Sequence, residues 1–180
     1  MSPIARLKTF LGHHQLARGM LAYSVIWPTA VAIQERFISK KQELPVDKMI
    51  RYGLFGTFYV APTVYCWLRI AKYLWPKPTL NHSLKKALVE QVTYTPFGMV
   101  SFYMGLNLLE GRSPADGWAE VREKLWPTYR VGAVVWPVAQ MINYTVIAEK
   151  NRLGFMSACS LMWSTFLAYM KSLDGDEKKK

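Results

Sequence analysis

The chain has 180 residues, 51% of them apolar and 14% aromatic, and a formal net charge of +11. This length fits one domain, and the mean hydropathy of +0.03 with 19% charged residues does not by itself separate a membrane protein from a soluble one. The positive charge is compatible with nucleic acid, anionic lipid or a small anion. Because it is spread over all the loops and no nucleic-acid-binding module is recognisable, we expect no sequence-specific nucleic acid binding.

The first 18 residues form a basic N-terminal segment without an acidic residue. Arg6, Lys8 and Arg18 supply its charge, and the apolar residues Ile4, Leu7 and Leu11 fall on one helical face. Two interpretations stay open. The segment resembles a mitochondrial targeting helix, although it is poor in serine, and it also fits a basic helix next to a membrane span.

Five stretches without any charged residue follow one another along the chain. They cover residues 19–34, 52–68, 91–109, 131–148 and 153–170. A charge near the centre of a bilayer costs on the order of 3 kcal/mol, and a helix needs about 20 residues to cross the hydrocarbon. The windows are slightly shorter, but flanking lysines and arginines can reach the interface with their long side chains. This pattern predicts membrane-spanning helices joined by short charged loops.

The loop between the third and fourth windows contains a helix start. Ser113 and Pro114 are a typical cap and first helical residue. Trp118, Val121 and Leu125 then form an apolar stripe, so we expect a short helix lying along the membrane interface. Residues 172–180 read as a solvated C-terminal tail.

Together these elements predict an all-α fold, a multi-span transmembrane helix bundle within a single membrane domain, 1–180. We expect four to five spans, because the first window, 19–34, is the shortest of the five. Lysines and arginines are divided almost evenly between the two sides, so the positive-inside rule gives no orientation.

Prolines fall inside four of the five windows, at Pro28, Pro62, Pro96 and Pro137. A proline inside a helix removes one backbone hydrogen bond and bends the helix. Four kinked helices would splay around a polar cavity. The alternative is that proline is simply commoner in membrane helices than in soluble ones.

Amide side chains recur inside or at the ends of these windows. Gln140 and Asn143 share one helical face with Trp136, Gln34 ends the first window, and Gln91 opens the third. Amides in a membrane helix need partners across the bundle or water. They are either contacts between helices or the lining of a hydrophilic path, and both interpretations stay open.

The sequence offers little for catalysis. Three histidines, His13, His14 and His82, lie in loops, without a cysteine or carboxylate at metal-ligand spacing. No glycine-rich phosphate loop or nucleophile elbow is present. We therefore expect no enzyme activity, no catalytic residue, no metal and no cofactor.

The fourth and fifth windows resemble the C-terminal signature of the Mpv-seventeen / twenty-two-kilodalton peroxisomal membrane protein family, and its Mpv-seventeen-like branch most closely. The residues that carry this resemblance are Trp136, Pro137, Gln140, Asn143, Arg152 and Trp163. Upstream, Gln91, Pro96 and Pro62 also stand where the family has similar motifs. The chain departs from the family at Ala148, where a proline is usual, and at Gln34–Glu35.

The resemblance implies a small multi-span protein of the mitochondrial inner membrane or, alternatively, of the peroxisomal membrane. It implies channel-like activity toward small hydrophilic solutes, linked to mitochondrial homeostasis and reactive-oxygen metabolism. The alternative is a scaffold without transport, an assembly partner of a larger mitochondrial complex such as the ribosome or a respiratory complex. Expected partners are the lipid bilayer, anionic lipid, and a larger membrane complex or a second copy of the chain.

Overall fold

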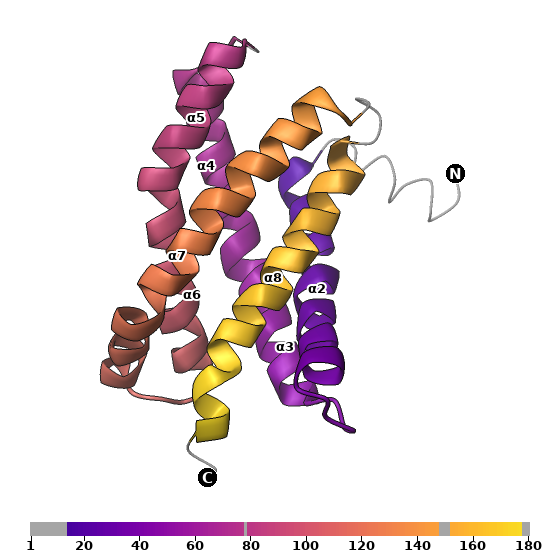
Figure 1. The fold of residues 1–180 in the computed structure, drawn as a ribbon, viewed down its shortest axis with the longest axis vertical. Coiled ribbons are helices and arrows are strands. Elements are labelled where there is room, and N and C mark those ends of the chain that lie inside the picture. Colours follow the sequence, from indigo (N-terminus) through magenta and orange to yellow (C-terminus); the bar gives the residue numbers. More distant parts are fainter. Residues whose placement is uncertain (1–13, 78, 148–151, 178–180) are drawn as a thin grey trace.

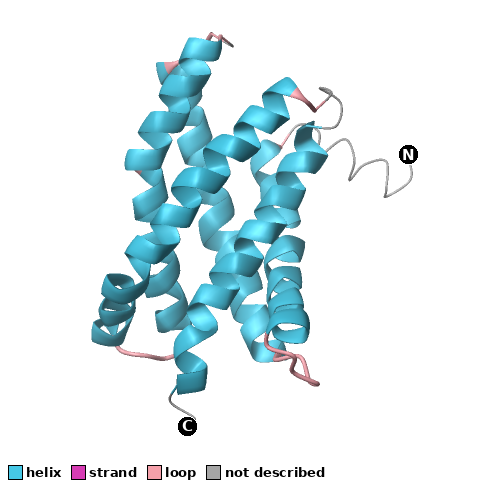
Figure 2. Cartoon of the chain, in the orientation of Figure 1, coloured by secondary structure: helices cyan, strands magenta, loops and turns pink. Residues whose placement is uncertain are grey.

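The computed structural model describes residues 14–77, 79–147 and 152–177, and this part of the chain is helical apart from its connections (Figures 1 and 2). The helices are α2 (Gln15–Ile33), α3 (Val46–Phe55), α4 (Ala61–Leu74), α5 (Leu80–Val92), α6 (Tyr94–Leu109), α7 (Pro114–Thr145) and α8 (Arg152–Glu177), with the π-helical turns η1 (Gln34–Ile38) and η2 (Gly56–Val60). The all-α prediction is confirmed.

These elements form five long rods that run alternately up and down (Figure 1). η1 continues α2, and η2 joins α3 to α4 without a loop. The α5 and α6 helices are divided only at Thr93, and α7 and α8 complete the bundle. One end of the bundle therefore collects the end of η1, the start of α3, the α6–α7 connection and the end of α8. Of the basic N-terminal segment 1–18, residues 1–13 lie outside the described part of the chain.

The α7 helix corrects one prediction. We expected a short interfacial helix separate from the fourth span, but Pro114–Thr145 is one helix of 32 residues. It continues because Pro127 and Pro137 are tolerated inside it, and because residues 118–131 contain no glycine or asparagine that would end a helix. Val121 of the predicted stripe is 2% exposed and belongs to the core, whereas Trp118 is 45% exposed.

Prolines are distributed differently from the expectation of four kinks. Pro28 and Pro137 stand inside α-helices, but Pro62 lies in the first turn of α4 and Pro96 is the third residue of α6. For Pro96, in the first turn after the division at Thr93, the missing N–H has no helical partner to lose. The π-helical turn η2 directly precedes Pro62, and such a turn accommodates an extra residue in a continuous rod.

Within the described ranges a single helix, Gln15–Ile38 with 24 residues, has the length and hydropathy of a membrane span. Two of the other uncharged windows are divided between shorter pieces, whereas residues 131–145 lie in α7 and residues 153–170 lie in α8. Residues 91–109 are divided at Thr93, which leaves 16 residues in α6, and residues 52–68 are divided among α3, η2 and α4. At the far end, α8 continues through Ser172 to Glu177.

An aromatic core fills the middle of the bundle. Trp27, Tyr52, Phe55 and Phe102 come from α2, α3 and α6, and the rings of Trp27 and Phe102 are 5.7 Å apart. Gly56 allows this packing, because a Cβ there would lie 2.5 Å from the Trp27 ring. We call these four residues the aromatic layer.

Candidate functional site

The most distinctive polar feature is a set of buried ion pairs at one end of the bundle. Two carboxylates organise it, Glu35 from η1 and Glu120 from α7, which are 1% and 5% exposed. Burying a charge is unfavourable unless it is paired and hydrogen-bonded. We call Glu35 and Glu120 with their partners the ionic end.

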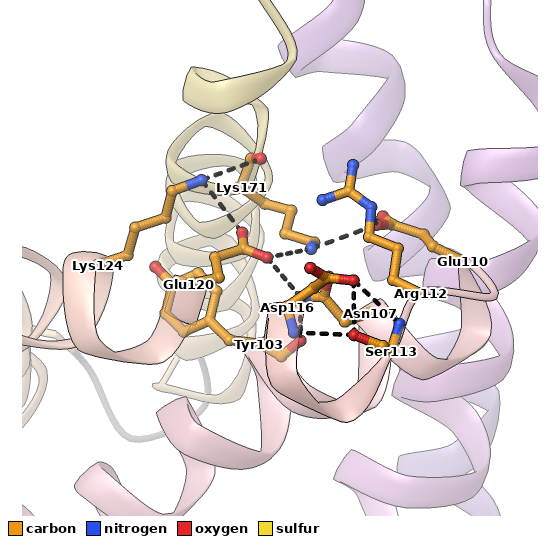
Figure 3. Close-up of polar contacts among 9 residues, drawn as sticks. All are labelled: Tyr103, Asn107, Glu110, Arg112, Ser113, Asp116, Glu120, Lys124 and Lys171. Carbon is orange, nitrogen blue, oxygen red and sulfur yellow. Dashed lines mark hydrogen bonds and ion pairs between the residues drawn. The ribbon is translucent and has the colours of Figure 1, made fainter. Parts of the chain in front are cut away.

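Glu120 lies at the centre of the first half (Figure 3). Its Oε1 is 3.1 Å from Lys124 Nζ and its Oε2 is 2.5 Å from Lys171 Nζ. Lys124 stands one helical turn away on α7, whereas Lys171 comes from α8. Asn107 of α6 donates its Nδ2–H to Glu120 and to the backbone oxygen of Tyr103. Three helices are therefore joined through one carboxylate.

The α6–α7 connection completes this half. Lys171 Nζ also lies 3.3 Å from Glu110 Oε2, which Arg112 Nε approaches at 3.4 Å. Gly111 between them has a φ of +74°, a left-handed conformation that favours glycine.

A capping box begins the next helix and fixes the position of Glu120. The Ser113 hydroxyl accepts from the Asp116 backbone N–H, and the Asp116 carboxylate accepts from the Ser113 backbone N–H (Figure 3). Satisfying these backbone groups holds the start of α7. Glu120 stands one turn beyond Asp116, so the capped turn presents it to α6 and α8.

Glu35 organises the second half. Lys48 Nζ of α3 is 2.7 Å from its Oε1, and Lys41 Nζ is 2.8 Å from its Oε2. The π-helical turn places Gln34 and Glu35 inward, while the following Arg36 is exposed. Lys48 also donates to Gln34 Oε1 at 3.1 Å.

Gln34 connects the two halves. This side chain is fully buried, and its Nε2–H donates to Ser39 Oγ at 2.7 Å and to Ser172 Oγ at 3.3 Å. Ser172 follows Lys171 on α8, which belongs to the Glu120 half. The amide thus lies between the two carboxylate centres.

The aromatic layer adjoins the ionic end, on the side toward the middle of the bundle. Lys48 Nζ is 5.8 Å from the centre of the Tyr52 ring, and Asn107 binds the backbone of Tyr103, the neighbour of Phe102. Two buried polar atoms of the layer, Trp27 Nε1 and Tyr52 Oη, have no hydrogen-bond partner among the described residues. Buried polar groups in native proteins are nearly always hydrogen-bonded, often to water. This layer therefore offers polar positions for water or a solute hydroxyl.

The amides of the proposed path are not gathered in one place. Gln34 belongs to the ionic end, whereas half-buried Gln140 is five residues before the opposite end of α7. Gln91 is half-buried in α5, and its backbone oxygen accepts from Tyr129 Oη at 3.1 Å. The side chain of Asn143 lies outside the described part, so the lining of a path by these amides stays a prediction.

Two family-signature residues outside the path pack against each other. Trp136 and Trp163 meet between α7 and α8 with ring centres 6.0 Å apart. Gly132 lies beneath Trp163, where a Cβ would be 2.9 Å from that ring. Pro137 is exposed on α7, and the side chain of Arg152 is not among those described.

Pro62 lines an apolar hollow on the surface between α4 and α6, together with Trp67 and Tyr94. Pro96 is half-buried near the start of α6. No group of three or more histidine, cysteine, aspartate or glutamate side chains suited to a metal ion occurs among the residues described.

The sequence did not predict that the charged residues of the ionic end are buried: it placed Glu120 in a short interfacial helix and Glu35 directly after the first window. A signal was present. Glu120 and Lys124 lie four apart, on the same helical face as the buried residues Gly117, Val121 and Thr128. A charge pair on the small and apolar face of a helix indicates burial, not a solvated loop.

Several known proteins are similar to this chain in sequence. The profile of the Mpv17 / PMP22 family matches residues 107–168, which include the signature residues of α7 and α8. The Mpv17-like protein of Xenopus laevis is 30% identical over 93% of this chain and 82% of its own length. Protein SYM1 of Yarrowia lipolytica is 26% identical over 78% of the chain and 66% of its own. Peroxisomal membrane protein 2 of Bos taurus is 27% identical over 71% and 65%. No solved structure matches the chain.

Proposed function

The chain belongs to the Mpv17 / PMP22 family, and from that premise we propose a channel-like protein that crosses an organellar membrane and passes small hydrophilic solutes. Membership confirms the resemblance drawn from residues 136–163 and makes the chain a membrane protein of a family found in mitochondria and peroxisomes. We place it in the mitochondrial inner membrane, with the peroxisomal membrane as the alternative. The acid-free residues 1–18 favour the first.

In the proposed arrangement each of the five rods crosses the membrane once. The first rod contains the shortest of the five uncharged windows. This arrangement puts the α2–α3 and α6–α7 connections on one side and the α4–α5 connection on the other (Figure 1). Single cysteines at Gln42, Arg112 and Lys77, in a background without Cys66 and Cys159, would test it. We expect a membrane-impermeant maleimide to label Gln42→Cys and Arg112→Cys from the same face, and Lys77→Cys only from the other. Labelling of all three from one face would contradict five crossings.

The observation that supports transport is the ionic end followed by the aromatic layer. Paired charges such as Glu35 with Lys48 become hydrated when water enters, and a ring of apolar side chains gates a pore by excluding water. The buried, unpartnered Trp27 Nε1 and Tyr52 Oη supply polar positions within the layer. In this proposal the ionic end is the closed mouth of the path, and Gln34, Gln91, Gln140 and Asn143 line parts of it.

Conductance of the purified full chain in planar bilayers tests the proposal. We expect the wild type to conduct, and Glu35→Gln to open more often because the mouth loses two ion pairs. Gln140→Leu combined with Asn143→Leu should lower the conductance of the open state. Glu123→Gln, on an exposed residue of α7, is the matched control and should behave as wild type. A folded wild type that never conducts would overturn the proposal.

A second function has its own supporting observation. The aromatic layer fills the bundle centre, with Tyr52 and Phe102 at 0% and 2% exposure. A bundle packed in this way also suits a scaffold that docks a larger complex or a second copy through its basic loops. Salt-sensitive co-purification with a stable partner, in the absence of any conductance, would favour that function.

A further inference from the structure

An exposed row of alternating aromatic and cationic side chains runs along the outside of α7. Trp118, Arg122, Trp126 and Arg130 follow one another at intervals of four residues, which places them on adjoining turns. Arg122 lies over the Trp118 ring at 5.9 Å, and Arg130 lies over the Trp126 ring at 5.1 Å. Trp118 and Trp126 are 45% and 57% exposed, and both arginines are exposed. We call these four residues the Arg/Trp row.

The depth of this row follows from one hydrogen bond. Tyr103 Oη and Thr128 Oγ1 are 2.6 Å apart, so Thr128 of α7 lies beside Tyr103 of α6. Tyr103 is six residues before the end of α6, which corresponds to about 9 Å along a helix. All of α6 is uncharged. Arg130, two residues after Thr128, therefore projects outward alongside the uncharged residues 91–109, near the start of that stretch, where Tyr129 contacts Gln91 next to Glu90.

An exposed guanidinium at that depth needs an anion or a route to the interface. Charges inside a membrane are costly, and long basic side chains lower this cost by reaching toward the headgroups. Both arginines lie over the tryptophan one turn nearer the start of α7, so both lean toward the ionic end. The row itself contains no carboxylate. Glu123 lies on another face of the helix, and Asp116 is engaged in the Ser113 cap.

We propose that the Arg/Trp row binds the phosphates of anionic phospholipids at the membrane interface, one phosphate at each arginine. A guanidinium matches a phosphate with two parallel hydrogen bonds, and tryptophan rings favour the headgroup region. This inference rests on the proposed crossing of α6 and α7. It does not depend on whether the protein conducts solutes.

Apolar surface for the lipid chains lies beside the row. Tyr129 stacks on Trp126 with ring centres 5.9 Å apart and donates to the Gln91 backbone oxygen. Leu88 and Val92, within one turn of Gln91, are 67% and 68% exposed. An acyl chain descending from the row would meet these side chains.

Native mass spectrometry of the purified, delipidated full chain, titrated with phosphatidylglycerol or phosphatidylcholine, tests the proposal. We expect phosphatidylglycerol to bind the wild type at least tenfold more tightly than phosphatidylcholine. Arg122→Gln combined with Arg130→Gln should remove this preference, and Arg122→Lys with Arg130→Lys should retain only part of it, because lysine lacks the planar fork.

The matched control is Arg69→Gln with Lys72→Gln, which removes the same charge from exposed positions of α4 and also breaks an arginine–tyrosine contact at Arg69. It should bind phosphatidylglycerol as wild type does. Circular dichroism checks that each variant is folded. The proposal is overturned if the double glutamine variant keeps the preference, if the control loses it equally, or if inorganic phosphate displaces the lipid and so identifies a soluble ligand. Conductance of the same variants is measured separately, so loss of lipid binding and loss of transport are distinguishable.

Discussion

The two carboxylates of the ionic end have similar burial but different partners. Glu120 is held by Lys124 and Lys171, whose side chains are each only 4% exposed. Glu35 is held by Lys48, 17% exposed, and by Lys41, 51% exposed. Glu120 is therefore sealed among three helices, whereas Glu35 faces a rim that water can reach. The difference indicates that the Glu120 half holds the bundle together and that the Glu35 half is the part suited to opening.

The largest effect is expected from Glu120→Gln. This change puts a neutral side chain beside buried Lys124 and leaves Lys171 with Glu110 as its carboxylate partner, and breaking one member of a buried ion pair costs about 3–5 kcal/mol. Denaturant unfolding in mild detergent, followed by circular dichroism, measures the free energy. Glu123→Gln, one turn away on the exposed face, should change it by less than about 0.5 kcal/mol. Equal losses in the two variants would contradict the burial argument.

A smaller effect is expected from Glu35→Gln. Lys41 can turn into water and Lys48 is partly exposed, so little charge is stranded, and we expect a loss of about 1–2 kcal/mol. The same unfolding measurement compares the two carboxylates directly. If Glu35→Gln destabilised the protein as much as Glu120→Gln, the distinction between the two halves would fail.

The contacts of Gln34 predict an energetic coupling between the two halves of the ionic end. Combining Glu35→Gln with Glu120→Gln should show a coupling energy of about 0.5–1 kcal/mol, since Gln34 contacts both Lys48 and Ser172. The coupling should disappear when the same cycle is repeated in a Gln34→Leu background. Strict additivity in the wild-type background would mean that the halves are independent.

The smallest effect is expected from Lys41→Ala. An ion pair with one exposed partner contributes about 0.2–1 kcal/mol and is screened by salt. Unfolding at low and high salt should show a modest loss at low salt that shrinks at high salt. A salt-independent loss would indicate that Lys41 packs against the bundle through its hydrocarbon stem.

Much of the fold could be predicted from the distribution of charge. The windows 19–34 and 153–170 fall within α2–η1 and α8, because an apolar helical stretch carries its signal locally. The division at Thr93 and the π-helical turns could not be predicted, since they depend on packing between rods. The prediction of a separate interfacial helix was wrong for the same reason. Val121 and Leu125 form an apolar stripe whether the helix lies at the interface or in the bundle, and only contact with α6 shows that the stripe faces the core.

The candidate site was less predictable than the fold. Pairing of Glu120 with Lys171 joins residues 51 positions apart, and no local pattern specifies such a contact. Glu35 directly follows the first window, so its position was visible, but its inward direction depends on the turn η1. The family resemblance, in contrast, could be recognised from Trp136, Pro137 and Gln140, because a short sequence motif can be identified without knowing which residues it contacts.

The turn η2 also has a consequence for insertions and deletions. A π-helical turn holds one residue more than the α-helix it interrupts, so losing Thr57 or Phe58 would leave a continuous α-helix from α3 to α4 that bends at Pro62 and keeps its two faces aligned. The same loss between Glu120 and Lys124 would rotate everything beyond it by about 100° and separate the two residues. The second rod of this bundle can therefore change its length by one residue, whereas the first half of α7 cannot.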